Sequence, residues 1–131
     1  MLSGILLYYI NKESDIMLFI QYPPCSTCRK AKNWLDAKGI AYTDRHIKDC
    51  NPTYEELKEW HEKSGLPLKK FFNTSGQMYK SLNLKEKLPA MTGEEQLRLL
   101  ATDGMLVKRP IAVKDGIILV GFKEAEWEKL I

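Results

Sequence analysis

The chain has 131 residues, of which 44% are hydrophobic and 28% charged, and its net charge is +3. This length predicts one domain with a core of its own, and this composition excludes a disordered chain. Charges of opposite sign alternate along the sequence, as in Lys85-Glu86-Lys87. Because no basic stripe is present, the charge pattern does not predict direct binding to nucleic acid.

The cysteine content sets the expected compartment. The chain has three cysteines, Cys25, Cys28 and Cys50. A small odd number does not fit the disulfide framework of a secreted protein. We therefore expect a cytoplasmic protein, in which a CxxC pair indicates redox chemistry or metal binding. No segment is apolar enough to predict a place in a membrane.

The first sixteen residues differ from the rest of the sequence. They carry the apolar stretch LSGILLYYI, which is too short to span a bilayer. They lack the cationic start and the small-residue cleavage site of a secretory signal. We interpret residues 1–16 as an N-terminal extension outside the fold and residues 17–131 as a single domain.

The first part of that domain has a strand, helix, strand pattern. Residues 17–22 (MLFIQY) predict a buried strand, and residues 27–38 predict a helix that Gly39 ends in a left-handed conformation. Residues 40–47 are rich in β-branched and aromatic side chains, which favours a second strand. The helix carries four side chains with the spacing of one face: Ala31, Trp34, Leu35 and Lys38.

Helices are predicted for the middle of the chain. Thr53 with Glu56, and Thr92 with Glu95, are two capping boxes, each of which marks a helix start. The first of these helices is expected to stop at Gly65, a residue type that often ends helices. The second is expected to run to the Asp-Gly pair at 103–104.

The last part of the chain predicts a hairpin followed by a helix. Two β-rich runs flank Asp115-Gly116, a strong hairpin signal, and residues 123–130 predict a short helix. The expected class is α/β: a thioredoxin-like fold with a mixed four-stranded sheet. A helical insertion, about residues 53–103, would separate its β-α-β half from its β-β-α half.

The stretch YPPCSTCRKA places Cys25 where the first strand passes into the first helix. Unpaired N–H groups at a helix N-terminus stabilise an anion, so the pKa of Cys25 should fall. Arg29 and Lys30 would add positive potential, and Ser26 and Thr27 complete the turn. Cys28 lies one helical turn further on, close enough for a disulfide. Cys25 is therefore the expected attacking thiol and Cys28 the resolving one.

Two other interpretations of the pair stay open. The pair could be half of a zinc site, which needs two further ligands. Only Cys50, His46 and His61 could supply them, and none forms a second paired motif, so we assign them no role. Alternatively, one thiol is catalytic and its neighbour incidental.

Arg109-Pro110 is the second candidate element of a site. In a thioredoxin-like fold a cis proline precedes the third strand, with its backbone facing the CxxC pair. Arg109 would then direct a permanently charged guanidinium toward the thiol pocket, where it could stabilise an oxyanion or a thiolate. The alternative is a surface arginine at the start of a strand.

These motifs together resemble one known family. YPPCSTCRKAKNWL, followed by LVKRPIAV and LVGFKEAEW, is similar to the family that joins glutaredoxin-coupled arsenate reductases with the Spx transcriptional regulators. The resemblance spans residues 17–131. It implies that Cys25 is catalytic, that Arg109 contacts an oxyanion and that no cofactor is bound. Electrons would come from glutathione with glutaredoxin, or from thioredoxin.

The sequence departs from both branches of that family. Asn73 stands where the reductases carry a second arginine, and Gly121 or Phe122 stands near the third; Cys28 has no counterpart in those enzymes. The CxxC pair is Spx-like, which implies redox sensing and binding to the RNA polymerase α subunit. The segment at 64–84 does not match the polymerase-binding region. Three functions remain: a thiol–disulfide oxidoreductase, a redox-switched regulator, and a structural zinc or inert-thiol domain.

Overall fold

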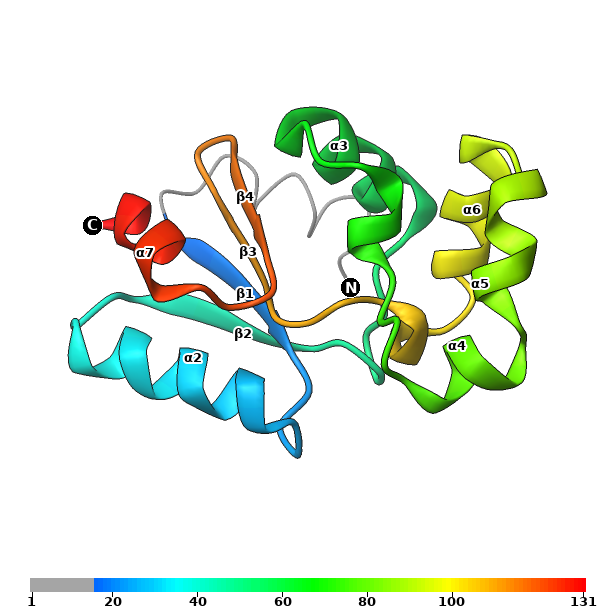
Figure 1. Ribbon diagram of the computed structural model, residues 1–131. Helices are drawn as coiled ribbons and strands as arrows, with labels where there is room; N and C mark the ends of the chain where they lie inside the picture. The colour runs from blue at the N-terminus through cyan, green and yellow to red at the C-terminus, as the bar shows by residue number, and fades with distance from the viewer. Residues whose placement is uncertain (1–15) are drawn as a thin grey trace, which may run out of the picture.

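The computed structural model describes residues 16–131 (Figure 1). The predicted N-terminal extension therefore lies outside the described residues, apart from Ile16. Within the described range, no helix combines the length and the apolar character that crossing a bilayer would require.

A mixed four-stranded sheet forms the centre of the fold (Figure 1). It contains β1 (Met17–Gln21), β2 (Tyr42–His46), β3 (Ile111–Lys114) and β4 (Ile117–Val120) in the order β2-β1-β3-β4. β1 runs parallel to β2 and antiparallel to β3, and β3 runs antiparallel to β4. This is the predicted thioredoxin-like arrangement.

The second strand is shorter than the sequence predicts. Residues 40–47 were expected to be extended, but β2 covers only Tyr42–His46. The N–H group of Ile40 donates to the carbonyl of Leu35 at the end of the preceding helix. This hydrogen bond holds the chain to the helix, so the strand begins two residues later.

The helix after the CxxC loop, α2, spans Ser26–Ala37, one residue earlier at each end than predicted. Gly39 adopts the predicted left-handed conformation, with φ of 68°. Lys38, at the end of the predicted face, is exposed, and its ammonium lies 5.9 Å from the centre of the Trp34 ring on the same face. Four residues of α2 are buried: Cys28, Ala31, Trp34 and Leu35.

The helical insertion between β2 and β3 consists of short helices. They are α3 (Tyr54–Ser64), η1 (Leu68–Phe71), α4 (Gln77–Ser81), α5 (Leu84–Lys87), η2 (Leu88–Ala90), α6 (Gly93–Leu100) and η3 (Gly104–Leu106). Both predicted capping boxes are formed, and Gly65 ends α3 in the left-handed region. The helix α6 ends at Leu100, earlier than the predicted Asp-Gly stop, because Asp103 caps η3 instead.

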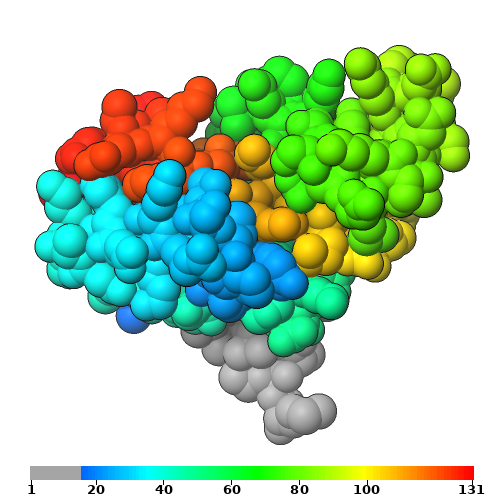
Figure 2. All heavy atoms as spheres, turned by 60° about the horizontal axis from the view of Figure 1, so that its bottom comes forward, coloured from blue at the N-terminus to red at the C-terminus, as the bar shows by residue number. Residues whose placement is uncertain are grey.

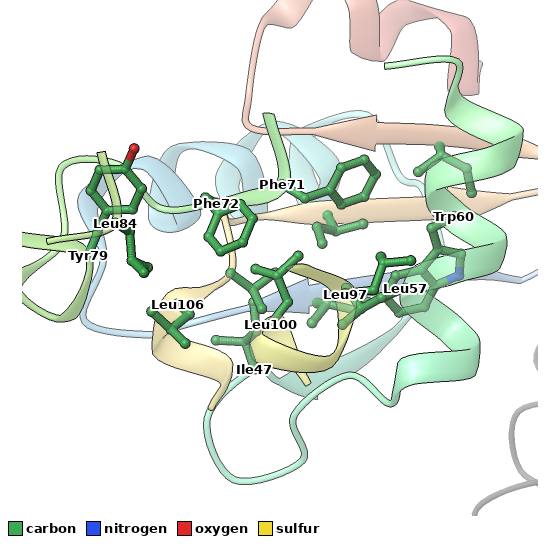
Figure 3. Close-up of a cluster of buried hydrophobic side chains, with 14 of the residues drawn as sticks. Ile47, Leu57, Trp60, Phe71, Phe72, Tyr79, Leu84, Leu97, Leu100 and Leu106 are labelled. Atoms are coloured by element: carbon green, nitrogen blue, oxygen red, sulfur yellow. The ribbon is translucent and has the colours of Figure 1, made fainter. Parts of the chain in front are cut away.

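The sheet separates two hydrophobic clusters. Because successive strand residues face opposite sides, Phe19 packs toward α2 and the C-terminal helix, whereas Leu18 and Ile20 pack toward the insertion. Figure 3 shows the insertion-side cluster, in which Ile47, Phe72 and Leu106 lie near one another. An isolated β-bridge between Phe72 and Val107 also connects the insertion to the chain that leads into β3.

The C-terminal elements follow the prediction with one change. Asp115 and Gly116 both have positive φ, 48° and 80°, as a tight two-residue hairpin turn requires. The helix predicted for 123–130 is divided into α7 (Glu124–Trp127) and a 3₁₀ turn, η4 (Glu128–Leu130). Burial of Trp127 and Leu130 fixes this segment on the sheet.

Candidate functional site

Cys25 lies at the junction between β1 and α2. The chain turns tightly after β1, where the N–H group of Cys25 donates to the carbonyl of Tyr22 at 2.9 Å. Cys25 has extended backbone angles and is the N-cap of α2, and its carbonyl accepts from the N–H group of Arg29 at 3.0 Å. The half-buried thiol is thus placed at the positive end of a twelve-residue helix.

The surroundings of Cys25 favour its thiolate. Burial alone would raise its pKa, but the N–H groups of Cys28 and Thr27, the Cys28 thiol and the Arg109 guanidinium outweigh that effect. The pKa of Cys25 is therefore lowered, in the direction that the sequence predicts.

Cys28 has the opposite environment. Its side chain is fully buried, and its sulfur accepts a hydrogen bond from the N–H group of Tyr22 at 3.4 Å. Burial, reinforced by the negative charge of Cys25, raises the pKa of Cys28 to about 12. Cys25, Cys28 and Cys50 all carry free thiols. The two cysteines of the pair are therefore unequal: one thiol is acidic and partly accessible, and the other is neutral and enclosed.

Arg109 reaches this loop from the far end of the sequence. The Arg109–Pro110 peptide bond is cis, as predicted, and Pro110 is buried. The Arg109 guanidinium lies close enough to the Cys25 sulfur to lower the pKa of that thiol. It lies 5.1 Å from the centre of the Tyr22 ring and donates to the carbonyl of Met105 at 3.5 Å. Figure 2 shows the blue surface around the start of α2 adjoining the amber segment that leads into β3.

Tyr22 is a site residue that sequence reasoning missed. Its ring lies under the Arg109 guanidinium, and its N–H group donates to Cys28. Its ring also meets His46 edge-on, with ring centres 5.6 Å apart. The only signal in the sequence was its place at the end of the predicted first strand, separated from Cys25 by two prolines. Tyr22 therefore connects the CxxC loop, Arg109 and the end of β2.

The supporting residues predicted around the pair occupy the first turn of α2. Ser26, Thr27 and Arg29 are exposed, and Thr27 contributes an N–H group near the Cys25 sulfur. The Arg29 guanidinium turns back to donate to the carbonyl of Pro24 at 3.0 Å. The guanidinium in contact with Cys25 is thus that of Arg109.

The candidate zinc ligands lie in different environments. Cys50 is exposed in the loop after β2, and His61 packs edge-on against Phe71 in the insertion at 5.9 Å. The side chain of His46 packs on Tyr22. Across residues 16–131, no group of three or more His, Cys, Asp or Glu side chains is placed to hold a metal ion.

Two positions at which the sequence departs from the arsenate reductases, Asn73 and Phe122, take part in local structural contacts. The N–H group of Asn73 donates to the carbonyl of Leu106 at 2.8 Å. Phe122 packs edge-on against Trp127 and Trp34, with ring centres 5.1 and 6.2 Å apart. An aromatic residue in this cluster stabilises the C-terminal segment and supplies no positive charge.

Curated relatives cover most of the chain. YusI of Bacillus subtilis is 55% identical over 86% of this chain and 96% of its own length. The regulatory protein MgsR of the same organism is 36% identical over 87% of this chain and 89% of its own length. The global transcriptional regulator Spx 1 of Bacillus cereus is 29% identical, covering 83% of this chain and 82% of Spx 1.

Solved structures agree with this relationship. A Bacteroides fragilis protein described as related to the ArsC family is 63% identical, with a TM-score of 0.86 over 88% of this chain and 97% of its own. A Streptococcus mutans UA159 protein described as a possible arsenate reductase is 47% identical, with a TM-score of 0.82 over 89% of this chain and 98% of its own. The ArsC family model matches residues 20–130, so the chain belongs to the ArsC family.

Proposed function

We propose that this protein is a cytoplasmic thiol–disulfide redox protein in which Cys25 is the nucleophile, Cys28 the resolving thiol and Arg109 the residue that stabilises the anion. The observation that carries the proposal is that the pKa of Cys25 is lowered whereas the pKa of Cys28, one helical turn away, is raised. A thiolate is the reactive form of cysteine, so the residue with the lowered pKa, Cys25, attacks the substrate first.

The proposed reaction transfers two electrons from the protein to an oxidised sulfur substrate. The Cys25 thiolate attacks one sulfur of a substrate disulfide, and the other substrate sulfur leaves as a thiolate. The Cys28 thiol then loses its proton and attacks Cys25, which releases the second substrate thiolate and leaves a Cys25–Cys28 disulfide. Two electrons from glutathione with glutaredoxin, or from thioredoxin, would restore both thiols.

The environment of Cys28 supports this order of events. While Cys25 is ionised, its negative charge and the burial of Cys28 keep the second thiol protonated. Formation of the mixed disulfide removes the charge from Cys25, so both contributions of Cys25 to the raised pKa of Cys28, its charge and its side-chain hydrogen bond, disappear and burial alone remains. The resolving thiol therefore becomes easier to ionise only after Cys25 has reacted.

Arsenate is a weaker candidate substrate than a disulfide. Arg109 is available to contact an oxyanion, but Asn73, and Gly121 or Phe122, stand where the resemblance places two further arginines. A coupled assay with glutathione, glutaredoxin and NADPH would reveal arsenate reduction as NADPH consumption. We expect no consumption above the rate without arsenate.

A redox titration tests the proposal directly. The reduced protein is equilibrated in glutathione buffers, free thiols are trapped by alkylation, and the label on each cysteine is counted by peptide mass. We expect a Cys25–Cys28 bridge with a midpoint in the cytosolic range, roughly −220 to −320 mV. The exposed Cys50 is a control within the same chain and should not lose label together with Cys25 and Cys28 as the bridge forms.

Two variants complete the test. Cys28→Ser should accumulate a mixed disulfide between Cys25 and glutathione, because no resolving thiol remains. Cys25→Ser should form neither the bridge nor that mixed disulfide. Full redox activity in Cys25→Ser would overturn the assignment. A mixed disulfide on Cys25 that Cys28 never resolves would favour a single-thiol mechanism.

The regulatory relatives favour a second candidate function. MgsR and Spx 1 carry names as regulators, and the same CxxC pair could act as a switch for binding the RNA polymerase α subunit. The discriminating experiment is capture of the purified C-terminal domain of that subunit by oxidised and reduced protein. Binding that changes with oxidation and disappears in Cys25→Ser would favour the switch over turnover.

A further inference from the structure

The helical insertion contains a cavity of about 300 Å³. Its apolar wall comes from Leu68, Leu88 and Pro89, and its polar groups come from Lys69, Lys85, Tyr79 and Gln96. All of these residues lie between η1 and α6, and none belongs to the CxxC loop or to β3. The volume is at the lower end of the range for small-molecule sites.

Tyr79 gives the cavity a directed hydrogen-bonding group. The side chain is only 6% exposed, and its ring packs against Phe72 with ring centres 6.4 Å apart. Figure 3 shows its hydroxyl pointing away from Leu84 and Leu106. Within the described part of the chain this hydroxyl makes no hydrogen bond, and since every fully buried polar side-chain atom there has a partner, the hydroxyl oxygen reaches solvent. The hydroxyl is therefore free to donate a hydrogen bond to a ligand in the cavity.

The charge around the cavity is positive. Residues 66–100, which run to the end of α6, contain six basic and three acidic residues, a net charge of +3. This equals the net charge of the whole chain, so the remaining residues are balanced in charge. The side chains of Lys69 and Lys85 form no ion pair with any residue that the structure describes. Two unpaired ammonium groups above an apolar wall favour an anion with an apolar body.

Gln96 makes this part of the cavity rigid. Its side-chain amide donates to the carbonyls of Leu88 and Met91 at 3.2 and 3.3 Å. These two hydrogen bonds hold α6 against η2, across the chain turn that carries Pro89. The cavity is therefore formed before a ligand arrives, which lowers the entropic cost of binding.

We propose that this cavity binds a small amphipathic carboxylate. The Tyr79 hydroxyl donates a hydrogen bond to the carboxylate, and Lys69 and Lys85 neutralise its charge. The apolar body of the ligand contacts Leu68, Leu88 and Pro89. The site is independent of the proposed thiol chemistry, because it shares no residue with the CxxC loop.

Binding is tested with 4-phenylbutyrate and its uncharged analogue 4-phenylbutyramide. Reduced, isotope-labelled full-length protein is titrated with each compound, and backbone amide shifts are followed by NMR at low ionic strength. We expect saturable shifts in η1, α4, η2 and α6 for the acid. An exposed ion pair contributes up to about 1 kcal/mol, or about fivefold in affinity, so the amide, which loses two such pairs, should bind about fivefold to about thirtyfold more weakly.

Four variants assign the contacts. Lys69→Gln and Lys85→Gln should each weaken binding of the acid about fivefold and leave binding of the amide unchanged. Tyr79→Phe keeps the ring and removes the hydroxyl, so it should weaken binding of the acid without lowering the unfolding temperature of the protein. Lys129→Gln changes an exposed lysine in η4, far from the cavity in sequence, and should have no effect.

The outcomes that overturn the proposal are equally specific. Equal affinity for the acid and the amide would show that the two lysines do not contribute to binding. Shifts confined to residues outside the insertion would place the ligand elsewhere. If Lys129→Gln lowered the affinity for the acid as much as Lys69→Gln does, the effect would come from the overall charge of the protein and not from the cavity. Absence of saturable binding by the acid would reject the site.

Discussion

At the scale of single residues, the candidate site depends on one long-range contact. The backbone N–H groups that stabilise the Cys25 thiolate come from the adjoining turn of α2, whereas the guanidinium comes from Arg109, just before β3. Tyr22 supports that guanidinium from below and also holds Cys28 by its N–H group. The reactivity of Cys25 should therefore respond to a change at a position remote in sequence.

Arg109→Ala is expected to raise the pKa of Cys25, because the variant loses a cation that contacts the sulfur. The measurement is the pH dependence of the alkylation rate in a Cys50→Ser background. Arg29→Ala is the matched control, since Arg29 lies in the same turn but donates to Pro24. Equal shifts in the two variants would show that overall charge, and not the Arg109 contact, sets the pKa.

The lowered pKa of Cys25 also makes the stability of the folded state depend on pH. The native pKa of Cys25 lies below the unfolded value, so its thiolate stabilises the folded state above the unfolded pKa. This contribution is lost as the pH falls through the native pKa. In Arg109→Ala that part of the pH dependence should become smaller.

At the scale of elements, the link between β2 and α3 is a buried ion pair. Arg45 at the end of β2 makes two hydrogen bonds, of 2.6 and 2.9 Å, to the carboxylate of Glu56 in the first turn of α3. The same guanidinium donates to the carbonyls of Cys50 and Asn51, and Glu56 also accepts from the N–H group of Thr53. One carboxylate thus caps a helix and holds the loop that precedes it.

Glu56→Ala is expected to lower the free energy of unfolding by about 3–5 kcal/mol, because it leaves the Arg45 charge without its buried partner. Glu55→Ala is the control, since Glu55 is exposed in the same turn and should cost no more than about 0.5 kcal/mol. Urea denaturation measures both. Similar losses in the two variants would mean that the ion pair does not hold α3.

At the scale of the whole molecule, the insertion is fixed to the sheet by close packing at Gly104. A Cβ atom at this position would lie 1.8 Å from the carbonyl oxygen of Ile47 and 2.6 Å from its carbonyl carbon. Ile47 directly follows β2, so the two ends of the insertion meet here. Backbone atoms cannot move aside as a flexible side chain can.

Gly104→Ala is therefore expected to destabilise the protein by about 3 kcal/mol, at the upper end of the range for overpacked cores. Gly93→Ala is the control. A Cβ atom at Gly93, in the first turn of α6, would have its nearest neighbour 4.0 Å away, at Leu68. It should leave stability unchanged or raise it slightly. An unchanged midpoint of thermal unfolding in Gly104→Ala would show that the two segments separate easily.

The features that the sequence predicts well depend on groups a few residues apart. The capping boxes at Thr53 and Thr92 form because each side chain reaches an N–H group three residues away. Asp115-Gly116 forms its turn because the backbone of these two residues tolerates positive φ. Cys25 lies at a helix start for the same local reason.

Only the tertiary structure decides which distant groups meet. It brings Arg109 to Cys25 and Arg45 to Glu56, and it encloses Tyr79 in a cavity of the insertion. The position of Arg109 was expected only through the thioredoxin-like fold, and no spacing in the sequence encodes the other two contacts, because each depends on how separately formed segments pack. The sequence by itself determined the elements and the position of the thiol pair. Packing determined which charge stabilises the thiolate, because electrostatic interactions depend on distance in space.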